Sequence, residues 1–310
     1  MAVPVHPTIL ALYGRRHADL FVDTGTILDL DGQVDALLRE PGWNPPLLPD
    51  VGRALLAASQ RGRFDITGAH AALAVDPLVT ARIAQRAQRE AGKRRTIATL
   101  HDVVDVLGTD GVARMVYEMV CQGRVFRAPG YLDAAIVARR RALATATVSG
   151  MLAELIPHAA LSPADAWTRS FLSDVGLQMA LVALGSARSA PPVASAWSVC
   201  VEAHARLGGR VLRAWGLTDA LAEAPALLHD PSPTPAATLL QLAEALVQDL
   251  DGGAEGDFPY AGAGTNAAYL AAEHILAVHV TAIGALREDA RGALQRQGLL
   301  NRAPRARATG

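Results

Sequence analysis

Three parts of the sequence carry residue types that bind ions, phosphates or metals, and none has the complete spacing for that chemistry. The DLDG segment at 29–32 resembles the start of a calcium loop, but it lacks the later Glu ligand, so we expect a turn. The Gly-rich segment 252–264 lacks the GK[ST] ending of a phosphate loop, and no strand is predicted before it. Cys121 and Cys200 form no CxxC pair, which favours buried thiols over zinc or redox chemistry.

The overall charge gives no indication that the protein binds a polyanion such as nucleic acid. The net charge is -1, so nucleic acid is an unlikely partner, and the basic tail at 301–310 is expected to be solvated. No stretch approaches the ~20 uninterrupted apolar residues of a membrane span, and the start of the chain lacks the charged and apolar regions of a secretion signal. We therefore expect a cytoplasmic protein without a membrane contact.

The composition and the spacing of apolar residues both predict an all-α protein. Hydrophobic residues make up 51% of the chain but aromatic residues only 5%, so Ala, Leu and Val must build the core. Helices are predicted near 9–17, 77–87, 100–107, 109–120, 133–155, 196–214, 236–250 and 266–297, with another that begins after Ser162. Asp76 and Ser162 are expected helix caps, a break is expected near Asp174, and the last helix is expected to kink near Gly284.

Four stretches, in this order and spacing, resemble the HDOD domain family of bacterial signalling proteins. They are PPLLPDV at 45–51, DPLVTARI at 76–83, IATL at 97–100 with VLGTDGV at 106–112, and HARLGGRVL at 204–212 with WGL at 215–217. The resemblance implies an HDOD-like helical bundle, related to HD phosphohydrolases, with an N-terminal helical subdomain. It divides the chain into an extension at 1–44, an HDOD-like domain at 45–250, and a C-terminal part at 251–310 with a Gly-rich loop, a helix and a basic tail.

The resemblance also implies where an HD metal site would lie. HD phosphohydrolases hold metal with a His, a His-Asp pair and a later Asp, and the metal activates water to attack phosphorus. Here the corresponding positions are Arg141, Ser173, Asp174 and Glu244. His204 and His229 are the other matching positions, and His229 is matched only loosely.

Two substitutions at these positions disfavour metal binding. Arg141 is permanently protonated and cannot bind a cation, and the Ser173 hydroxyl is a poor ligand for transition metals. We expect no catalytic residue, no metal and no cofactor. Our hypothesis is that the Arg141 guanidinium pairs with Asp174 and replaces the charge of the metal, because a buried carboxylate needs a counter-charge.

Each position also has an ordinary structural interpretation. Asp174 can serve as a helix cap, His204 can bond a backbone carbonyl, and Glu244 can face solvent. The arginines at 139–141 can form a solvated face, since only one of three successive helical positions points into a bundle. Trp215 is expected to anchor a helix end in the core.

The predicted function is a non-catalytic regulatory scaffold in signal transduction that binds a protein partner. Two alternatives stay open. One is a metal-dependent HD-type phosphohydrolase that uses Asp174, His204, His229 and Glu244. The other is a nucleotide-binding module for a second messenger, in which Arg141 and its neighbours contact phosphate.

Overall fold

The computed structural model describes residues 24–40, 43–47, 66–121, 131–156, 160–186, 192–228, 234–251 and 265–300, and these contain helices and no strand. The helices are α2 (Thr24–Arg39), α4 (Ile66–Leu73), α5 (Pro77–Ala91), α6 (Leu100–Cys121), α7 (Leu132–Leu155), α8 (Pro163–Ser173), α9 (Val175–Gly185), α10 (Val193–Ala214), α11 (Asp219–Ala222), α12 (Ala224–Leu227), α13 (Pro235–Leu250), α14 (Thr265–Leu276) and α15 (Val280–Arg296). The all-α prediction is confirmed.

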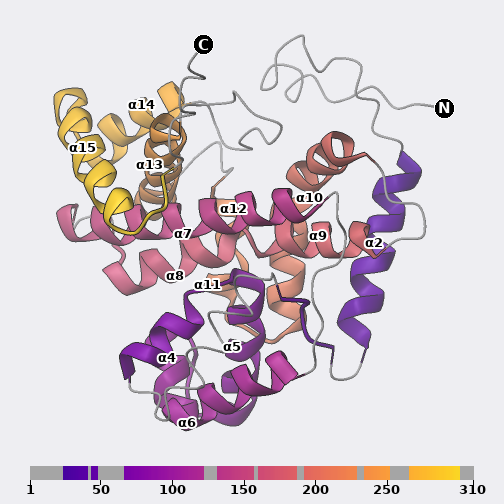
Figure 1. Ribbon diagram of the computed structural model, residues 1–310. Coiled ribbons are helices and arrows are strands. Elements are labelled where there is room, and N and C mark those ends of the chain that lie inside the picture. Colours follow the sequence, from indigo (N-terminus) through magenta and orange to yellow (C-terminus); the bar gives the residue numbers. More distant parts are fainter. Residues whose placement is uncertain are drawn as a thin grey trace, which may run out of the picture.

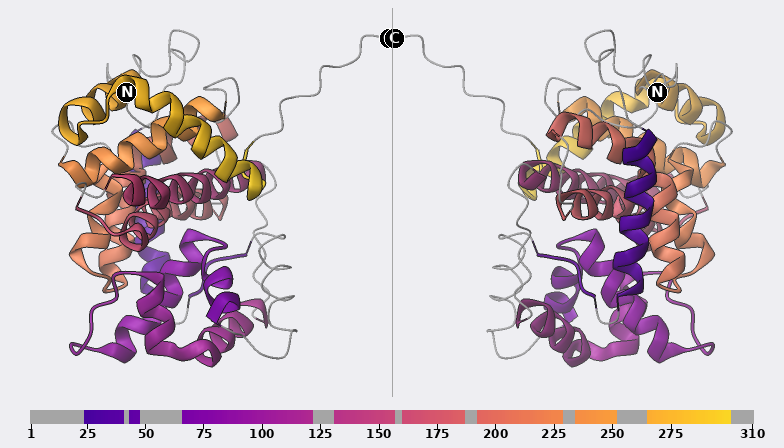
Figure 2. Two further views of the ribbon diagram at one scale, coloured as in Figure 1. Left: turned by 90° about the vertical axis from the view of Figure 1, so that its left-hand side faces the viewer. Right: turned by 90° about the vertical axis from the view of Figure 1, so that its right-hand side faces the viewer.

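The helices form two groups, one on either side of a central layer (Figure 1). Helices α4, α5 and α6 pack together at one end, and α13, α14 and α15 gather at the other, with α7 and α8 between them. Helix α2 lies along the outer side of the bundle against α9 and α10, as the right-hand view of Figure 2 shows. No single helix in the described segments is long and apolar enough to cross a membrane, although α14 and α15 would pass that test only together, as a pair bent by 111°.

Helix boundaries follow the local signals in the sequence. The Asp76 carboxylate accepts hydrogen bonds from the backbone N–H groups of Leu78 and Val79, and the Ser162 hydroxyl accepts one from Asp165. Gly108 adopts a positive φ of 66° and kinks α6 at the predicted break. These three features confirm the expected caps and the break between the helices predicted at 100–107 and 109–120.

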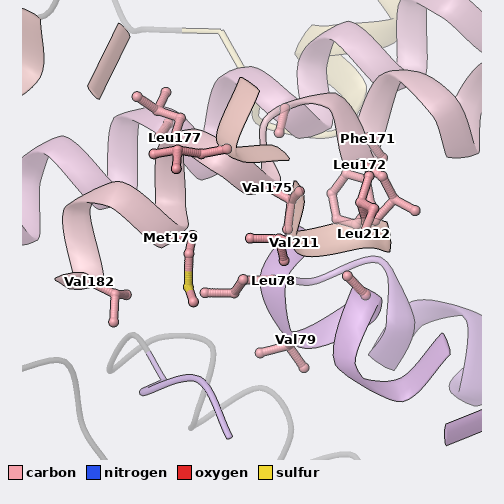
Figure 3. Close-up of a cluster of buried hydrophobic side chains, with 14 of the residues drawn as sticks. Leu78, Val79, Phe171, Leu172, Val175, Leu177, Met179, Val182, Val211 and Leu212 are labelled. Carbon is pink, nitrogen blue, oxygen red and sulfur yellow. The ribbon is translucent and has the colours of Figure 1, made fainter. Parts of the chain in front are cut away.

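Helix α5 joins the N-terminal subdomain to the bundle through a shared apolar core. Leu78 and Val79, directly after the Asp76 cap, are buried against side chains of α8, α9 and α10. Figure 3 shows Leu78 near Val211 and Val175, with Val79 below them in the same cluster. The DPLV sequence therefore both starts the helix and supplies the apolar contact that docks it.

Helix α7 is shared by two cores. Its first half, with Ala138 and Ala142, belongs to the core around α8, α9 and α10. Its second half, with Val148 and Leu152, belongs to a separate cluster made with α13, α14 and α15. The C-terminal helices therefore bury the far side of α7.

Two predictions of local structure were wrong. The DLDG segment at 29–32 is not a turn but the middle of α2, because Leu30 and Val34 are fully buried and this burial outweighs the low helix propensity of Gly32. The last helix does not kink near Gly284. Its chain breaks at 277–279 instead, where Ala277 has a positive φ of 50° and His279 caps α15. The predicted helix at 9–17 and the apolar stretch at 48–56 lie outside the described residues.

Candidate functional site

Asp174 stands at the junction between α8 and α9. It is the single residue between the two helices, with φ of -87° and ψ of 2°, and its side chain makes no capping hydrogen bond to α9. Asp174 therefore occupies the cap position expected for it, but its carboxylate does not cap α9. Asp174 is a half-buried residue whose carboxyl group can interact with groups from other helices.

Asp174, Glu244 and Arg141 come from three different elements and interact electrostatically. Burial raises the pKa of Asp174 to about 7, and the positive charge of Arg141 acts against this rise. Burial also raises the pKa of Glu244 to about 8, with a further upward contribution from Asp174 and an opposing one from Arg141. We call Asp174 and Glu244 the carboxyl pair. Glu244 is half-buried rather than exposed on the surface of α13.

Arg141 is held inside the bundle from more than one side. Its guanidinium carbon lies 5.7 Å from the centre of the Trp197 ring on α10, and its Nε lies 3.9 Å from a carboxylate oxygen of Asp251. The Arg141 side chain is only 13% exposed. A permanent cation therefore occupies the neighbourhood of the carboxyl pair.

The neighbouring arginines do not form a solvated face, contrary to that alternative. Arg140 makes a two-pronged ion pair with Asp251, with N–O distances of 2.7 and 2.8 Å, and its Nη1 also donates to the backbone carbonyl of Leu299. Arg139 donates to the carbonyl of Val75 at 3.4 Å, on the N-terminal side of the molecule. All three successive arginines therefore make contacts within the fold, Arg139 toward Val75 and the other two toward Asp251.

Ser173 and His204 are both bonded within their own helices. The buried Ser173 hydroxyl donates to the carbonyl of Ser170 at 2.6 Å. The buried His204 ring is hydrogen-bonded through Nδ1 to the carbonyl of Val201, one turn earlier in α10. Burial lowers the pKa of His204 and so favours its neutral form. His229 lies outside the described residues.

Polar side chains that sequence reasoning missed lie one helical turn from Asp174. Ser170 and Gln178 are buried, and Ser170 Oγ and Gln178 Nε2 have no hydrogen-bond partner within the described segments. Their spacing of four residues on either side of Asp174 is a signal that could have found them. Asp251, the partner of Arg140, gave no such signal because it lies 111 residues away in the chain.

These residues do not fit an HD metal centre. The positions of two imidazole ligands hold a guanidinium and a hydroxyl that is already bonded within its helix. Within the described residues, no three His, Cys, Asp or Glu side chains are grouped so that they could hold a metal ion. The pKa values of the carboxyl pair lie near neutral pH, so both groups can exchange protons there.

Comparisons with known proteins identify a family and a similar fold. The model of the HDOD domain family matches residues 46–231. A solved structure of the MmoQ response regulator from Methylococcus capsulatus str. Bath is similar, with a TM-score of 0.55 and 19% sequence identity, over 86% of this chain and 100% of that one. At this identity the likeness concerns the fold. The comparison with curated proteins gave no match.

Proposed function

Because the chain belongs to the HDOD domain family, we propose that it is a non-catalytic signalling scaffold that works through contacts with a protein partner in the bacterial cytoplasm. One observation carries the proposal. The Arg141 guanidinium stands close enough to the carboxyl pair to oppose the rise in both carboxyl pKa values, in the region where a related hydrolase would hold its metal. The Arg141 side chain thus supplies the positive charge that a metal ion would supply in the hydrolase.

The burial of Arg141 supports this interpretation. Placing a divalent ion beside a guanidinium that is 13% exposed would cost strong like-charge repulsion in a medium of low dielectric constant. The raised carboxyl pKa values add to the cost, since metal ligands must be deprotonated and both groups resist losing their protons. The structural similarity to a response regulator agrees with a role in signalling.

The test combines affinity capture with metal analysis. The tagged full-length protein is recovered from its native cell, and captured proteins and bound metals are both quantified. We expect a stoichiometric protein partner and much less than one iron, manganese or zinc per chain. The Asp174→Asn/Glu244→Gln variant is the matched control and should capture the same partner, because a scaffold does not depend on these carboxylates for chemistry. Stoichiometric metal, lost in the control variant, would support the phosphohydrolase alternative.

The nucleotide-binding alternative is tested separately. Arg141 already faces the carboxyl pair and the Trp197 ring, which leaves it less available for a phosphate group. A thermal-shift screen with nucleotides and cyclic dinucleotides should therefore leave Tm unchanged. A ligand present at 100 times its Kd adds ~2.7 kcal/mol to the free energy of unfolding, so true binding would be readily seen.

A further inference from the structure

We propose that the α9–α10 face beneath α2 is a docking surface for an acidic amphipathic helix of a partner protein, and that α2 occupies this surface until the partner displaces it. The inference deepens the proposed scaffold function and rests on it, because it names the chemistry of the partner. The surface is built from α9 and α10, which lie within the family match at 46–231, whereas α2 lies before that match.

Charge complementarity fixes the chemistry of the occupant. On α10, Arg206 and Arg210 are one turn apart, and on α2 so are Asp31 and Asp35. Asp31 is paired with both arginines, at 3.1 Å from Arg210, and Asp35 is paired with Arg210. The arginine side chains are 51% and 38% exposed even with α2 in place, so an incoming helix can reach them.

An apolar row runs beside the charged one. Leu30 and Val34 of α2 are fully buried, and Leu37 and Leu38 pack against the same core, so the spacing is i, i+4, i+7 and i+8. An occupant of this surface must therefore present leucine-like side chains at this spacing, with carboxylates one position further on. This is the mode in which an amphipathic helix binds in a groove.

Helix α2 is suited to being displaced. Gly25 and Gly32 lie inside it, and glycine costs about 1 kcal/mol relative to alanine in a helix. Asp31 and Asp35 repel one another at i, i+4 when the arginines are absent. Just after α2, Trp43 is buried against Trp215 at the end of α10, with ring centres 6.4 Å apart. This contact can keep the chain attached when α2 leaves its position.

The test uses the purified full-length chain and a labelled peptide with the sequence of residues 24–39 as the probe. In the Asp31→Arg/Asp35→Arg variant, α2 should be repelled by α10, its amide hydrogen exchange should accelerate, and the peptide should bind about tenfold more tightly than to the unmodified chain. Adding Arg206→Asp/Arg210→Asp restores the opposite charges in cis, so exchange should slow again and peptide binding should be lost. The matched control is Arg86→Asp, an exposed arginine on α5, which should change neither measurement.

Two outcomes overturn the inference. If exchange in α2 is unchanged in the Asp31→Arg/Asp35→Arg variant, the ion pairs do not hold the helix in place. If α2 is released but the peptide does not bind, or binds regardless of the charge at 206 and 210, the surface does not select an acidic helix. If the peptide binds as expected but no partner is captured from cells, the docking surface is supported and the scaffold function is refuted. The two proposals can therefore be contradicted separately.

Discussion

Gly176, at the start of α9, lies directly against the backbone of His204 on α10. A side chain at Gly176 would overlap the carbonyl oxygen of His204, and its Cβ would lie 2.8 Å from the Cα of Gly208. Gly208 in turn approaches Pro225 of α12, where an added Cβ would be 2.9 Å from the proline ring. Gly176 and Gly208 therefore allow α9, α10 and α12 to pack closely, and no ligand is needed to explain these glycines.

This close contact predicts that Gly176→Ala is strongly destabilising. Backbone atoms cannot move aside as a flexible side chain can, so we expect a loss of about 3 kcal/mol or more in the free energy of unfolding. Gly284→Ala is the control, because Gly284 is an exposed residue inside α15 with no atom within 4 Å of an added Cβ. That substitution should stabilise the protein by about 0.5–1 kcal/mol. Urea denaturation measures both, and equal effects would contradict the packing argument.

The carboxyl pair predicts that stability falls as the pH rises from 6 to 9. The pKa of Asp174 is raised from 3.8 to about 7, and that of Glu244 from 4.5 to about 8, so the folded state binds more protons than the unfolded state between these values. Below the unfolded-state pKa values both carboxyl groups are protonated in either state, and the folded protein pays no cost for their burial. This relative stability is lost as the pH rises through the folded-state values of about 7 and 8. Asp174→Asn should flatten the dependence and raise the stability at pH 8.5 by at least about 1.4 kcal/mol, which corresponds to one pKa unit.

Thermal unfolding at several pH values measures this effect. Glu154→Gln is the control, because Glu154 is an exposed carboxylate on α7 and its removal should leave the pH profile unchanged. A wild-type Tm that stays constant between pH 6 and 9 would show that ionisation of the carboxyl pair does not destabilise the folded state.

The role of Arg141 predicts a destabilisation that depends on pH. Arg141→Met removes the cation that opposes the raised pKa values, so both carboxylates become more costly to ionise. We expect a loss of about 2 kcal/mol or more at pH 8.5 and a smaller loss at pH 6, where the carboxyls are largely neutral. Adding Asp174→Asn and Glu244→Gln should recover part of the loss at pH 8.5. Arg114→Met, at an exposed position of α6, serves as the control. A pH-independent loss would mean that Arg141 acts only through packing.

The two-pronged pair between Arg140 and Asp251 predicts a loss of stability when it is broken. Asp251 has only 4% of its side chain exposed, so Arg140→Met removes the closer of its two arginine pairs, leaves the longer pair with Arg141 at 3.9 Å, and should cost about 3 kcal/mol. Arg291→Met breaks the exposed pair with Glu288 on α15 and should cost less than about 1 kcal/mol. Denaturant titration compares the two. Similar losses for both variants would show that the buried pair contributes no more than a surface one.

Local sequence signals predicted most of the fold. Asp76 and Ser162 followed by proline marked helix starts, and Gly108 marked a break, because these signals act within a few residues. Helix α2 could not be predicted in this way, since its helical form depends on the burial of Leu30 and Val34 against α9 and α10, which are distant in sequence. The break near Ala277 was missed for a related reason, as alanine carries no signal for a positive φ.

The candidate site was predictable only in part. The resemblance pointed to Arg141, Asp174 and Glu244, which the fold brings close enough to shift one another's ionisation. It did not indicate Asp251 or Trp197, which contact Arg141 from a helix end and a helix that are distant in sequence. Such partners follow from tertiary packing, and no motif in a single sequence encodes them.

The division of α7 between two cores bears on how this protein can be shortened. A fragment cut to the family match at 46–231 would discard α13, α14 and α15, which cover Val148 and Leu152, and would remove Asp251 from beside Arg140. The remaining fragment would expose a strip of aliphatic surface along α7, together with an unneutralised arginine. Its expected fate is self-association and precipitation, so the autonomous folding unit extends well past the boundary that family membership alone would draw.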